Sequence, residues 1–200
     1  MASYEIEGVI PVVHPTAFVH ETASLIGDVH IGPGCYVGPF ASLRGDFGRI
    51  VVGEGSNIQD SCVLHVFPEK ETRLEPRSHI GHAAVLHGCH IGSNALIGIG
   101  ASILDDAVIG EDSLVGAGSV VTAGTIIPPR SLVLGSPARV VRELDDETVE
   151  WKRNGVDVYQ ELARRSLETL RRVDPLTEIE PNRPKLQIAG ERARPLKPMP

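Results

Sequence analysis

Residues 91–133 read IGSNALIGIGASILDDAVIGEDSLVGAGSVVTAGTIIPPRSLV, and this stretch repeats itself every six residues. Four residues after each repeated position comes Ala, Ser or Thr, until Pro137 ends the series, and glycine often follows the position directly. A fixed short period is the signature of a repeat architecture and decides the fold before any other feature. The repeated positions hold only β-branched aliphatic residues: Ile91, Ile97, Ile103, Ile109, Val115, Val121, Ile127 and Val133.

This repeat predicts a parallel β-helix in which each six-residue unit forms one flat side of a triangular coil. Three units, about 18 residues, complete one coil, and each aliphatic residue points inward onto its equivalent about 4.8 Å away. Glycine is expected to relieve the backbone at the turns. Residues 10–140 would supply roughly seven coils. The same step occurs earlier in the chain, with one three-residue insertion, at Val19, Leu25, Ile31, Val37, Leu43, Val52, Ile58 and Leu64.

The composition agrees with this fold and excludes several classes of protein. Aromatic residues make up only 4% of the chain and glycine numbers 21, so small and β-branched side chains must fill the core. With a net charge of −7, we expect no nucleic-acid partner and no acidic membrane partner. No apolar run approaches the roughly 18 residues of a membrane span, and the N-terminal residues do not resemble a signal peptide. The three cysteines are expected to be small core residues of a cytoplasmic protein.

The six-residue step ends near residue 140, which divides the chain into three expected segments. These are a β-helix domain over residues 1–140, a helical segment over 141–174 and a proline-rich extended tail over 175–200. Asp145 is the predicted N-cap of the helical segment, and Gly155 is expected to divide it into a short and a longer helix. An apolar stripe at helical spacing is expected to pack on the outside of the coil. It consists of Val156, Tyr159, Leu162, Leu167, Leu170 and Val173.

The step is interrupted at residues 43–52 and 65–92, and the second interruption carries five of the eight histidines. His65 and His82 are 17 residues apart, close to one coil, so we expect them to lie near each other in stacked coils. His87 is expected one side of the triangle further on. Identical coils packed around a threefold axis would bring His65 and His87 of one subunit to His82 of its neighbour.

Three neutral imidazoles with one open position are typical of a catalytic zinc site. The alternative is three solvated surface histidines, and the spacing alone leaves both interpretations open. Cys62 and Cys89 are weaker candidates as ligands because of their places in the repeat. His79 and His90 are expected to lie beside the site or in solvent.

Two stretches resemble the γ-class carbonic anhydrase family: RGDFGRIVVGEGSNIQDSCVLH at residues 44–65 and IGHAAVLHGCHIGSNALIG at residues 80–98. The resemblance covers about residues 10–140. It implies a left-handed parallel β-helix, assembled as a homotrimer with one metal ion at each subunit interface. Together with the helical segment, the expected fold is all-β, a left-handed parallel β-helix of hexapeptide repeats with a C-terminal α-helix.

The family motif carries over to this sequence residue by residue. The implied metal ligands are His65, His82 and His87. The implied interface residues are Arg44 and Asp60, which would form an ion pair, and Asp46 as a further acid. The implied polar groups beside the metal-bound solvent are Asn57 and Gln59. A site of three imidazoles accepts Zn²⁺, and Fe²⁺ or Co²⁺ as alternatives.

Further stretches resemble the phenylacetic acid degradation branch of the family, which has a carnitine-operon branch as its near relative. These stretches are HVFPE at residues 65–69, GSPARVVREL at 135–144, EWKRNGVDVYQEL at 150–162 and PLTEIEPNR at 175–183. The resemblance implies hydrolysis of aromatic acyl-CoA thioesters. The long acidic insertion that carries a proton-shuttling glutamate in the archetypal carbonic anhydrase is missing here, which argues against fast CO₂ hydration.

The predicted chemistry begins with a metal ion that acidifies water to a pKa near 7. The resulting hydroxide would attack either a thioester carbonyl or CO₂, with Gln59 orienting it and Asn57 stabilising the oxyanion. Tyr159 either reaches over the pocket or packs as core, and Glu69 and Glu71 either shuttle protons or are solvated charges. We expect a thioesterase, with a carbonic anhydrase as the first alternative and a metal-free hexapeptide acyltransferase as the second. CoA would lie in an outer groove between subunits, held by the loop of residues 67–76 and the C-terminal helix.

Overall fold

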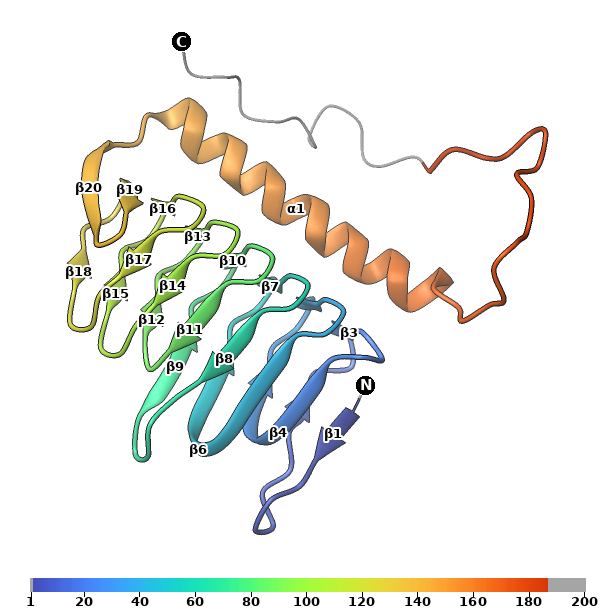
Figure 1. Cartoon of the computed structure of the whole chain (residues 1–200), viewed down its shortest axis with the longest axis horizontal. Coiled ribbons are helices and arrows are strands. Elements are labelled where there is room, and N and C mark those ends of the chain that lie inside the picture. Colours follow the sequence, from blue (N-terminus) through green and yellow to red (C-terminus); the bar gives the residue numbers. More distant parts are fainter. Residues whose placement is uncertain (1, 187–200) are drawn as a thin grey trace.

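The computed structural model describes residues 2–186, whereas residue 1 and residues 187–200 lie outside the description. The chain winds into a parallel β-solenoid of about seven turns, and one long helix crosses one side of the coil (Figure 1). The predicted parallel β-helix of hexapeptide repeats with a C-terminal helix is therefore confirmed.

The coil has three faces, which we number in the order in which the chain visits them after residue 20. Face 1 contains β1 (Ala2–Tyr4), the first half of β4 (Ser24–Ile31), the first half of β6 (Ser42–Val52), β8 (Val63–His65), β11 (Val85–His87), β14 (Ser102–Ile103) and β17 (Val120–Val121). Face 2 contains β2 (Val12–Val13), the second halves of β4 and β6, β9 (Glu71–Leu74), β12 (His90–Ile91), β15 (Val108–Ile109) and β18 (Ile126–Ile127). Face 3 contains β3 (Phe18–Val19), β5 (Tyr36–Val37), β7 (Asn57–Ile58), β10 (His79–Ile80), β13 (Leu96–Ile97), β16 (Leu114–Val115), β19 (Ser131–Gly135) and β20 (Ala138–Glu143).

The inward positions form continuous apolar rows, because strands of successive coils pair in parallel and in register. On face 3, for example, Ile97 pairs with Ile80 below it and Val115 above it, and all three are fully buried. The three cysteines are free and buried in the same interior, as predicted. Burial raises the pKa of the Cys89 thiol to about 12, so this group is an inert core residue rather than a thiolate.

Glycine has a second role, which we did not predict, at the position directly after the repeated aliphatic residue. A Cβ on Gly98 would lie 2.5 Å from the backbone nitrogen of Ala117, so this glycine is needed for close stacking of one coil on the next. Its φ is not in the left-handed region. The left-handed residues at the turns include glycines, as predicted, such as Gly100 and Gly118 with φ of 66°. Others are polar residues such as Asn94, Asp106 and Asp112, whose φ angles are 55–58°.

The irregularities of the repeat all fall at the corner between face 1 and face 2. The first insertion lies inside β6, where Gly45 pairs with Gly27 but Ile50 pairs with Val29. The second is the loop between β8 and β9, and the one-residue contraction follows β11. A single corner of the coil is thus rebuilt, while the other two keep the regular turn.

Helix α1 (Asp146–Thr169) is a single helix, and the predicted break at Gly155 is wrong. Asp145 caps it as predicted, since its side chain accepts a hydrogen bond from the Thr148 N–H. A glycine in a helix interior costs only about 1 kcal/mol. Lys152 and Val156, which flank Gly155, are both buried against the coil, and this packing outweighs the cost.

The helix covers face 3 and runs back along the coil towards its N-terminal end, near β3, β5 and β7 (Figure 1). The predicted apolar stripe packs on the coil only in part: Val156 is buried, whereas Leu167 and Leu170 are about half exposed. Residues 170–186 have no regular secondary structure, and the rest of the predicted tail lies outside the described residues. Over residues 2–186, no helix has the length and apolar character needed to cross a membrane.

Candidate metal centre

His65 and His87 lie side by side at the rebuilt corner. They end strands β8 and β11, which pair in register with His87 directly above His65. Their ring centroids are 5.1 Å apart, and Nδ1 of His65 lies 3.1 Å from Nε2 of His87. The two imidazoles therefore present one nitrogen each to the same point.

A carboxylate holds the other nitrogen of each ring. Asp46 Oδ1 lies 3.1 Å from His65 Nε2, and Asp105 Oδ1 lies 2.7 Å from His87 Nδ1. An ionised carboxylate can only accept a hydrogen bond, so the ring nitrogen next to it carries the proton. These contacts therefore favour the tautomers in which the two nitrogens that face each other carry lone pairs. Ligand histidines of metal sites are commonly oriented by carboxylates in this way.

The geometry of the pair fits a divalent metal ion. Two imidazole nitrogens bound to one tetrahedral zinc ion, at about 2.0–2.1 Å each, lie roughly 3.3 Å apart. The distance of 3.1 Å here is close to that value. Burial lowers the pKa of His65 below its ordinary value, against the opposing effect of Asp46, so its ring is neutral and able to bind a metal at pH 7.

His82 lies elsewhere, at the corner between face 3 and face 1. The expected proximity of His65 and His82 within one chain is wrong, because the loop after β8 lengthens this coil and places His87, 22 residues on, above His65. Nδ1 of His82 lies 2.6 Å from Asp60 Oδ2. Within one chain, residues 2–186 contain no group of three His, Cys, Asp or Glu side chains placed to hold a metal ion.

Asn57 and Gln59 form a buried polar cluster with His79 on face 3, beneath the helix. Gln59 Nε2 donates to Asn57 Oδ1 at 3.1 Å and lies 2.7 Å from His79 Nε2, which must accept because an amide nitrogen can only donate. Both amide hydrogens of Gln59 are thus engaged, and its Oε1 remains available as an acceptor. Asn57 is fully buried, and its Nδ2 has no hydrogen-bond partner within the described chain.

His79 is a member of this cluster, so of its two expected places it takes the one beside the predicted site residue Gln59 and not the one in solvent. Burial, with a smaller effect of the Lys152 charge, lowers its pKa to about 4, so the ring is neutral. The Tyr159 ring packs edge-on against it, with centroids 5.3 Å apart, and also contacts Tyr36. Burial raises the pKa of the Tyr159 hydroxyl to about 12. In one chain Tyr159 therefore packs as part of the helix–coil contact, the second of its two predicted roles.

Arg44 and Asp60 do not pair within the chain. The Arg44 guanidinium instead binds Asp46, with Nη1 2.8 Å from Oδ2, while Asp60 binds His82. Burial raises the pKa of the Asp46 carboxyl, but the hydrogen bonds from Arg44 and His65 outweigh it and leave the pKa below its ordinary value. Asp46 therefore links the arginine to the histidine pair.

The sequence did not predict that three further residues lie near the pair, although Phe67 begins the loop that was expected to hold CoA. Asp105 lies 18 residues after His87, one regular coil, and this spacing was the signal that could have found it. Phe47 and Phe67 lie in the two insertions and contact the imidazoles of His65 and His87 respectively. Neither aromatic has a periodic signal, because insertions lie outside the repeat.

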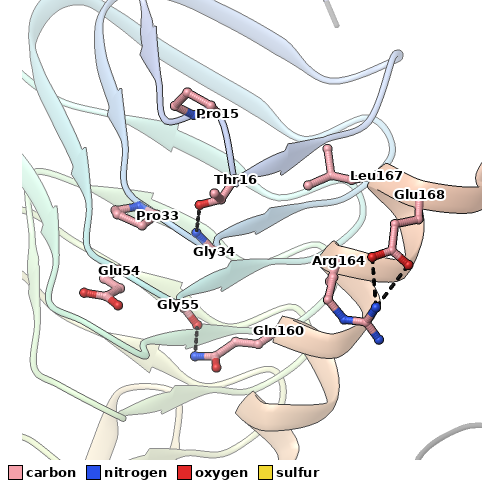
Figure 2. A pocket seen from close by; sticks show the side chains of 10 residues that line it. All are labelled: Pro15, Thr16, Pro33, Gly34, Glu54, Gly55, Gln160, Arg164, Leu167 and Glu168. Carbon is pink, nitrogen blue, oxygen red and sulfur yellow. Dashed lines mark hydrogen bonds and ion pairs between the residues drawn. The ribbon is translucent and has the colours of Figure 1, made fainter.

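A pocket lies away from this centre. It has a volume of about 580 Å³ and lies between the C-terminal half of α1 and three stacked turns at the corner between face 2 and face 3 (Figure 2). Gln160 donates to the Gly55 carbonyl oxygen on its wall, and Arg164 pairs with Glu168. None of the candidate metal ligands lines it, so we place the chemistry at the histidine corner and treat this pocket as part of helix docking.

The coil and its repeat define a hexapeptide-repeat protein, and residues 88–123 match the family described as bacterial transferase hexapeptide (six repeats). Among curated proteins, the carnitine operon protein CaiE of Escherichia coli K12 is 51% identical over 187 residues, which cover 94% of this chain and 95% of the relative. CaiE of Citrobacter koseri is 50% identical over 191 residues, which cover 96% and 97%. The chain therefore belongs to the hexapeptide-repeat family that includes the carnitine operon protein CaiE.

Solved structures agree with this assignment. A hexapeptide transferase family protein from Anaplasma phagocytophilum has a TM-score of 0.79 and 37% identity, covering 82% of this chain and 96% of its own. The BC4754 gene product of Bacillus cereus, assigned as an acetyltransferase, has a TM-score of 0.80 and 37% identity, covering 82% and 95%. The family thus indicates an enzyme, whose reaction has to be argued from the site.

Proposed function

We propose that this chain is a metal-dependent hydrolase that cleaves acyl-CoA thioesters as a homotrimer, with its metal ions between subunits. The observation that carries the proposal is the pair of facing nitrogens of His65 and His87, each ring fixed by its own carboxylate. His82 of a neighbouring subunit would complete the ligand set.

The position of His82 supports assembly about a threefold axis. Face 1 runs from the corner that carries His82 to the corner that carries His65 and His87. With face 1 of each copy turned towards the axis, the His82 corner of one copy meets the histidine pair of the next. One of the two outward rows of this face is small and uncharged, as a flat interface requires: Ser24, Ser42, Val63, Val85, Ser102 and Val120.

When bound, Zn²⁺, or Fe²⁺ or Co²⁺ in its place, would supply the Lewis acidity that generates a nucleophile from water near neutral pH. His65, His87 and the neighbour's His82 would hold the ion. Gln59 would come to the site with His82, since both lie at the same end of face 1. Its free Oε1 would accept a hydrogen bond from the attacking water and orient it.

Asn57 would act through Gln59 rather than on the substrate directly. Its carbonyl oxygen holds the Gln59 amide, and it is fully buried. The earlier assignment of Asn57 to the oxyanion would require its Nδ2 to become accessible in the assembly. Tyr159 would fix His79, which in turn holds Gln59, so it would be a positioning residue.

Two observations favour a thioester over CO₂ as the substrate. Proteins of known structure that share 37% identity with this chain are assigned as acetyltransferases or hexapeptide transferases, and acetyl donors are thioesters in such chemistry. The histidine pair is also flanked by exposed aromatic rings, which CO₂ does not need. The sequence also resembles the phenylacetic acid degradation branch of the family, and this resemblance favours aryl-CoA esters as the substrates that are hydrolysed.

The start of the loop of residues 67–76, namely residues 67–70, and helix α1 lie on opposite sides of one chain, since the loop begins at the corner opposite face 3 (Figure 1). A CoA molecule that contacts both would therefore use the loop of one subunit and the helix of the next. This arrangement requires the same trimer as the metal site.

Two other functions remain as alternatives. A carbonic anhydrase would use the same neutral imidazoles and the same oriented water on CO₂. A hexapeptide acyltransferase, favoured by the structural relatives, would need one histidine as a base and no metal.

One preparation of defined metal content distinguishes the three. We expect phenylacetyl-CoA hydrolysis that rises with metal occupancy and is abolished by chelation. Fast CO₂ hydration without thioester cleavage would identify the carbonic anhydrase. Acetyl transfer to an amine or hydroxyl that persists after metal removal would identify the acyltransferase.

A further inference from the structure

The two insertions that rebuild the corner each place one phenylalanine beside the histidine pair. Phe47 lies in the first insertion, within β6, and Phe67 lies in the loop after β8. Both rings are more than half exposed, at 56% and 53%. The repeat is therefore interrupted twice, and each interruption delivers an exposed aromatic side chain to the same place.

The rings form a row with the imidazoles. The Phe47 ring centroid lies 5.3 Å from that of His65, and the Phe67 ring meets His87 edge-on at 4.8 Å. Because His65 and His87 are themselves 5.1 Å apart, an aromatic ring stands at each end of the pair.

The two insertions are fixed against each other and against the strands that carry the histidines. A Cβ on Gly48 would lie 2.6 Å from the Phe67 carbonyl oxygen, so only glycine permits this approach. Arg49 N–H donates to the Lys70 carbonyl oxygen at 3.1 Å. The buried Thr72 hydroxyl donates to the His65 carbonyl oxygen at 2.7 Å and accepts from the Gly88 N–H at 2.8 Å. The aromatic side chains thus stand on preorganised backbone.

We propose that Phe47 and Phe67 form a clamp for the acyl group of the substrate and select apolar acyl groups, aryl ones above all. This inference rests on the proposed function. A thioester carbonyl that reacts beside His65 and His87 must hold its acyl group within a few ångströms of these imidazoles. Aromatic rings gain from stacking on an apolar or aryl group. The thioester bond places the acyl group at the rings, whereas the adenine ring of CoA lies at the far end of a long flexible arm.

The test compares phenylacetyl-CoA with acetyl-CoA on zinc-loaded wild type and on the variants Phe47→Ala and Phe67→Ala. The matched control is Ile126→Ala, which removes an exposed apolar side chain from β18 on face 2, away from the histidine pair. We expect kcat/KM for phenylacetyl-CoA to fall roughly tenfold in each clamp variant. The value for acetyl-CoA and the zinc content should change little, and the control should match wild type.

A binding measurement separates failure of the clamp from failure of the proposed function. Phenylacetate and acetate are titrated into the same zinc-loaded proteins by calorimetry or saturation-transfer NMR. Wild type could bind phenylacetate, and both clamp variants lose this binding, although no thioester is cleaved. That result would support the clamp and contradict the proposed hydrolase function. If thioesters are cleaved but the ratio of the two substrates is the same in wild type and variants, the clamp is wrong. The clamp is also wrong if the variants form fewer trimers but the remaining trimers keep the wild-type ratio of kcat/KM for phenylacetyl-CoA to kcat/KM for acetyl-CoA. The two rings would then be interface residues.

Discussion

His65 and His87, 22 residues apart in the chain, meet in register on neighbouring strands with Nδ1 and Nε2 facing at 3.1 Å. Two lone pairs at that distance repel each other unless a proton or a metal ion lies between them. The opposite nitrogens are occupied by Asp46 and Asp105, so the pair is already oriented. Each half of the site can therefore be tested separately.

Asp105 is expected to fix the tautomer of His87. In Asp105→Asn the amide can donate to His87 Nδ1, which favours the tautomer with its proton on Nε2, the nitrogen meant for the metal. We expect zinc affinity to fall about 10–100-fold, as measured by competition with a chelator. Asp106→Asn is the matched control, since the neighbouring carboxylate is exposed and binds Lys70 instead. Equal losses in the two variants would show a general charge effect rather than an oriented ligand.

Asn57 and Gln59 are expected to act as one unit. Gln59→Ala removes the group that orients water, and Asn57→Ala removes the acceptor that holds Gln59. We expect each to lower kcat about a hundredfold while zinc content stays near wild type. The double variant should lose little more than either single variant. If the double variant instead lost kcat by the product of the two single losses, Asn57 would contact the substrate independently.

Substitution of Arg44 tests whether its ion pair lies on the surface of one chain or at an interface between two. Within one chain, Arg44 is 42% exposed and bound to Asp46, and a pair of this kind contributes about 0–1 kcal/mol. At a trimer interface with Asp60 of the next copy, Arg44→Ala would remove one partner of a buried ion pair and cost about 3 kcal/mol or more. Sedimentation equilibrium should show weakened trimers. Unchanged assembly with lost turnover would place Arg44 at the substrate instead.

Lys152 gives the helix–coil contact a dependence on pH. Its side chain is buried, donates to the Asn94 carbonyl oxygen and lies 3.7 Å from Asp112. Burial lowers its pKa from 10.5 to about 8, against the opposing effect of Asp112. Between pH 8 and pH 10.5, Lys152 is largely protonated in the unfolded chain and largely neutral in the folded chain. The free energy of unfolding therefore increases as the pH rises from 8 towards 10.5.

Lys152→Met, which keeps the apolar stem, should remove this contribution. From pH 7 to pH 10 the free energy of unfolding of wild type should rise relative to the variant by roughly 2–3 kcal/mol. Urea denaturation at the two pH values measures it. Parallel pH profiles of wild type and variant would contradict a lowered pKa of Lys152.

The coil could be predicted from the sequence because its interior repeats: every sixth residue faces the same environment, and Ile91 to Val133 show this directly. The pairing of His65 with His87 could not be derived from that step, because the loop after β8 changes the length of one coil. Counting 17 residues from His65 led to His82, which lies at another corner. Resemblance to a family supplied the ligand set proposed here where the period could not.

The low helix propensity of glycine also led to a wrong prediction, a break of the helix at Gly155. A glycine at a helical position indicates a break only when tertiary contacts on both sides are weak, and here Lys152 and Val156 are buried against the coil. Phe47 and Phe67 escaped prediction for a related reason. An insertion carries no period, so only the three-dimensional structure shows that two of them meet at one pair of histidines.

The central claim is that the metal site is divided between two copies of the chain. Mixing His82→Ala with His87→Ala tests it most directly. In a mixed trimer, a His82→Ala chain supplies His65 and His87, and its His87→Ala neighbour supplies an intact His82. That one interface then has all three ligands. The matched control mixes His65→Ala with His87→Ala, in which every interface lacks a member of the pair.

Each variant alone should bind little zinc. The first mixture, refolded or exchanged to mixed trimers, should regain about one zinc ion per mixed trimer with thioesterase activity in proportion, and the control mixture should regain none. Full zinc content in any single variant, or equal recovery in both mixtures, would contradict the divided site.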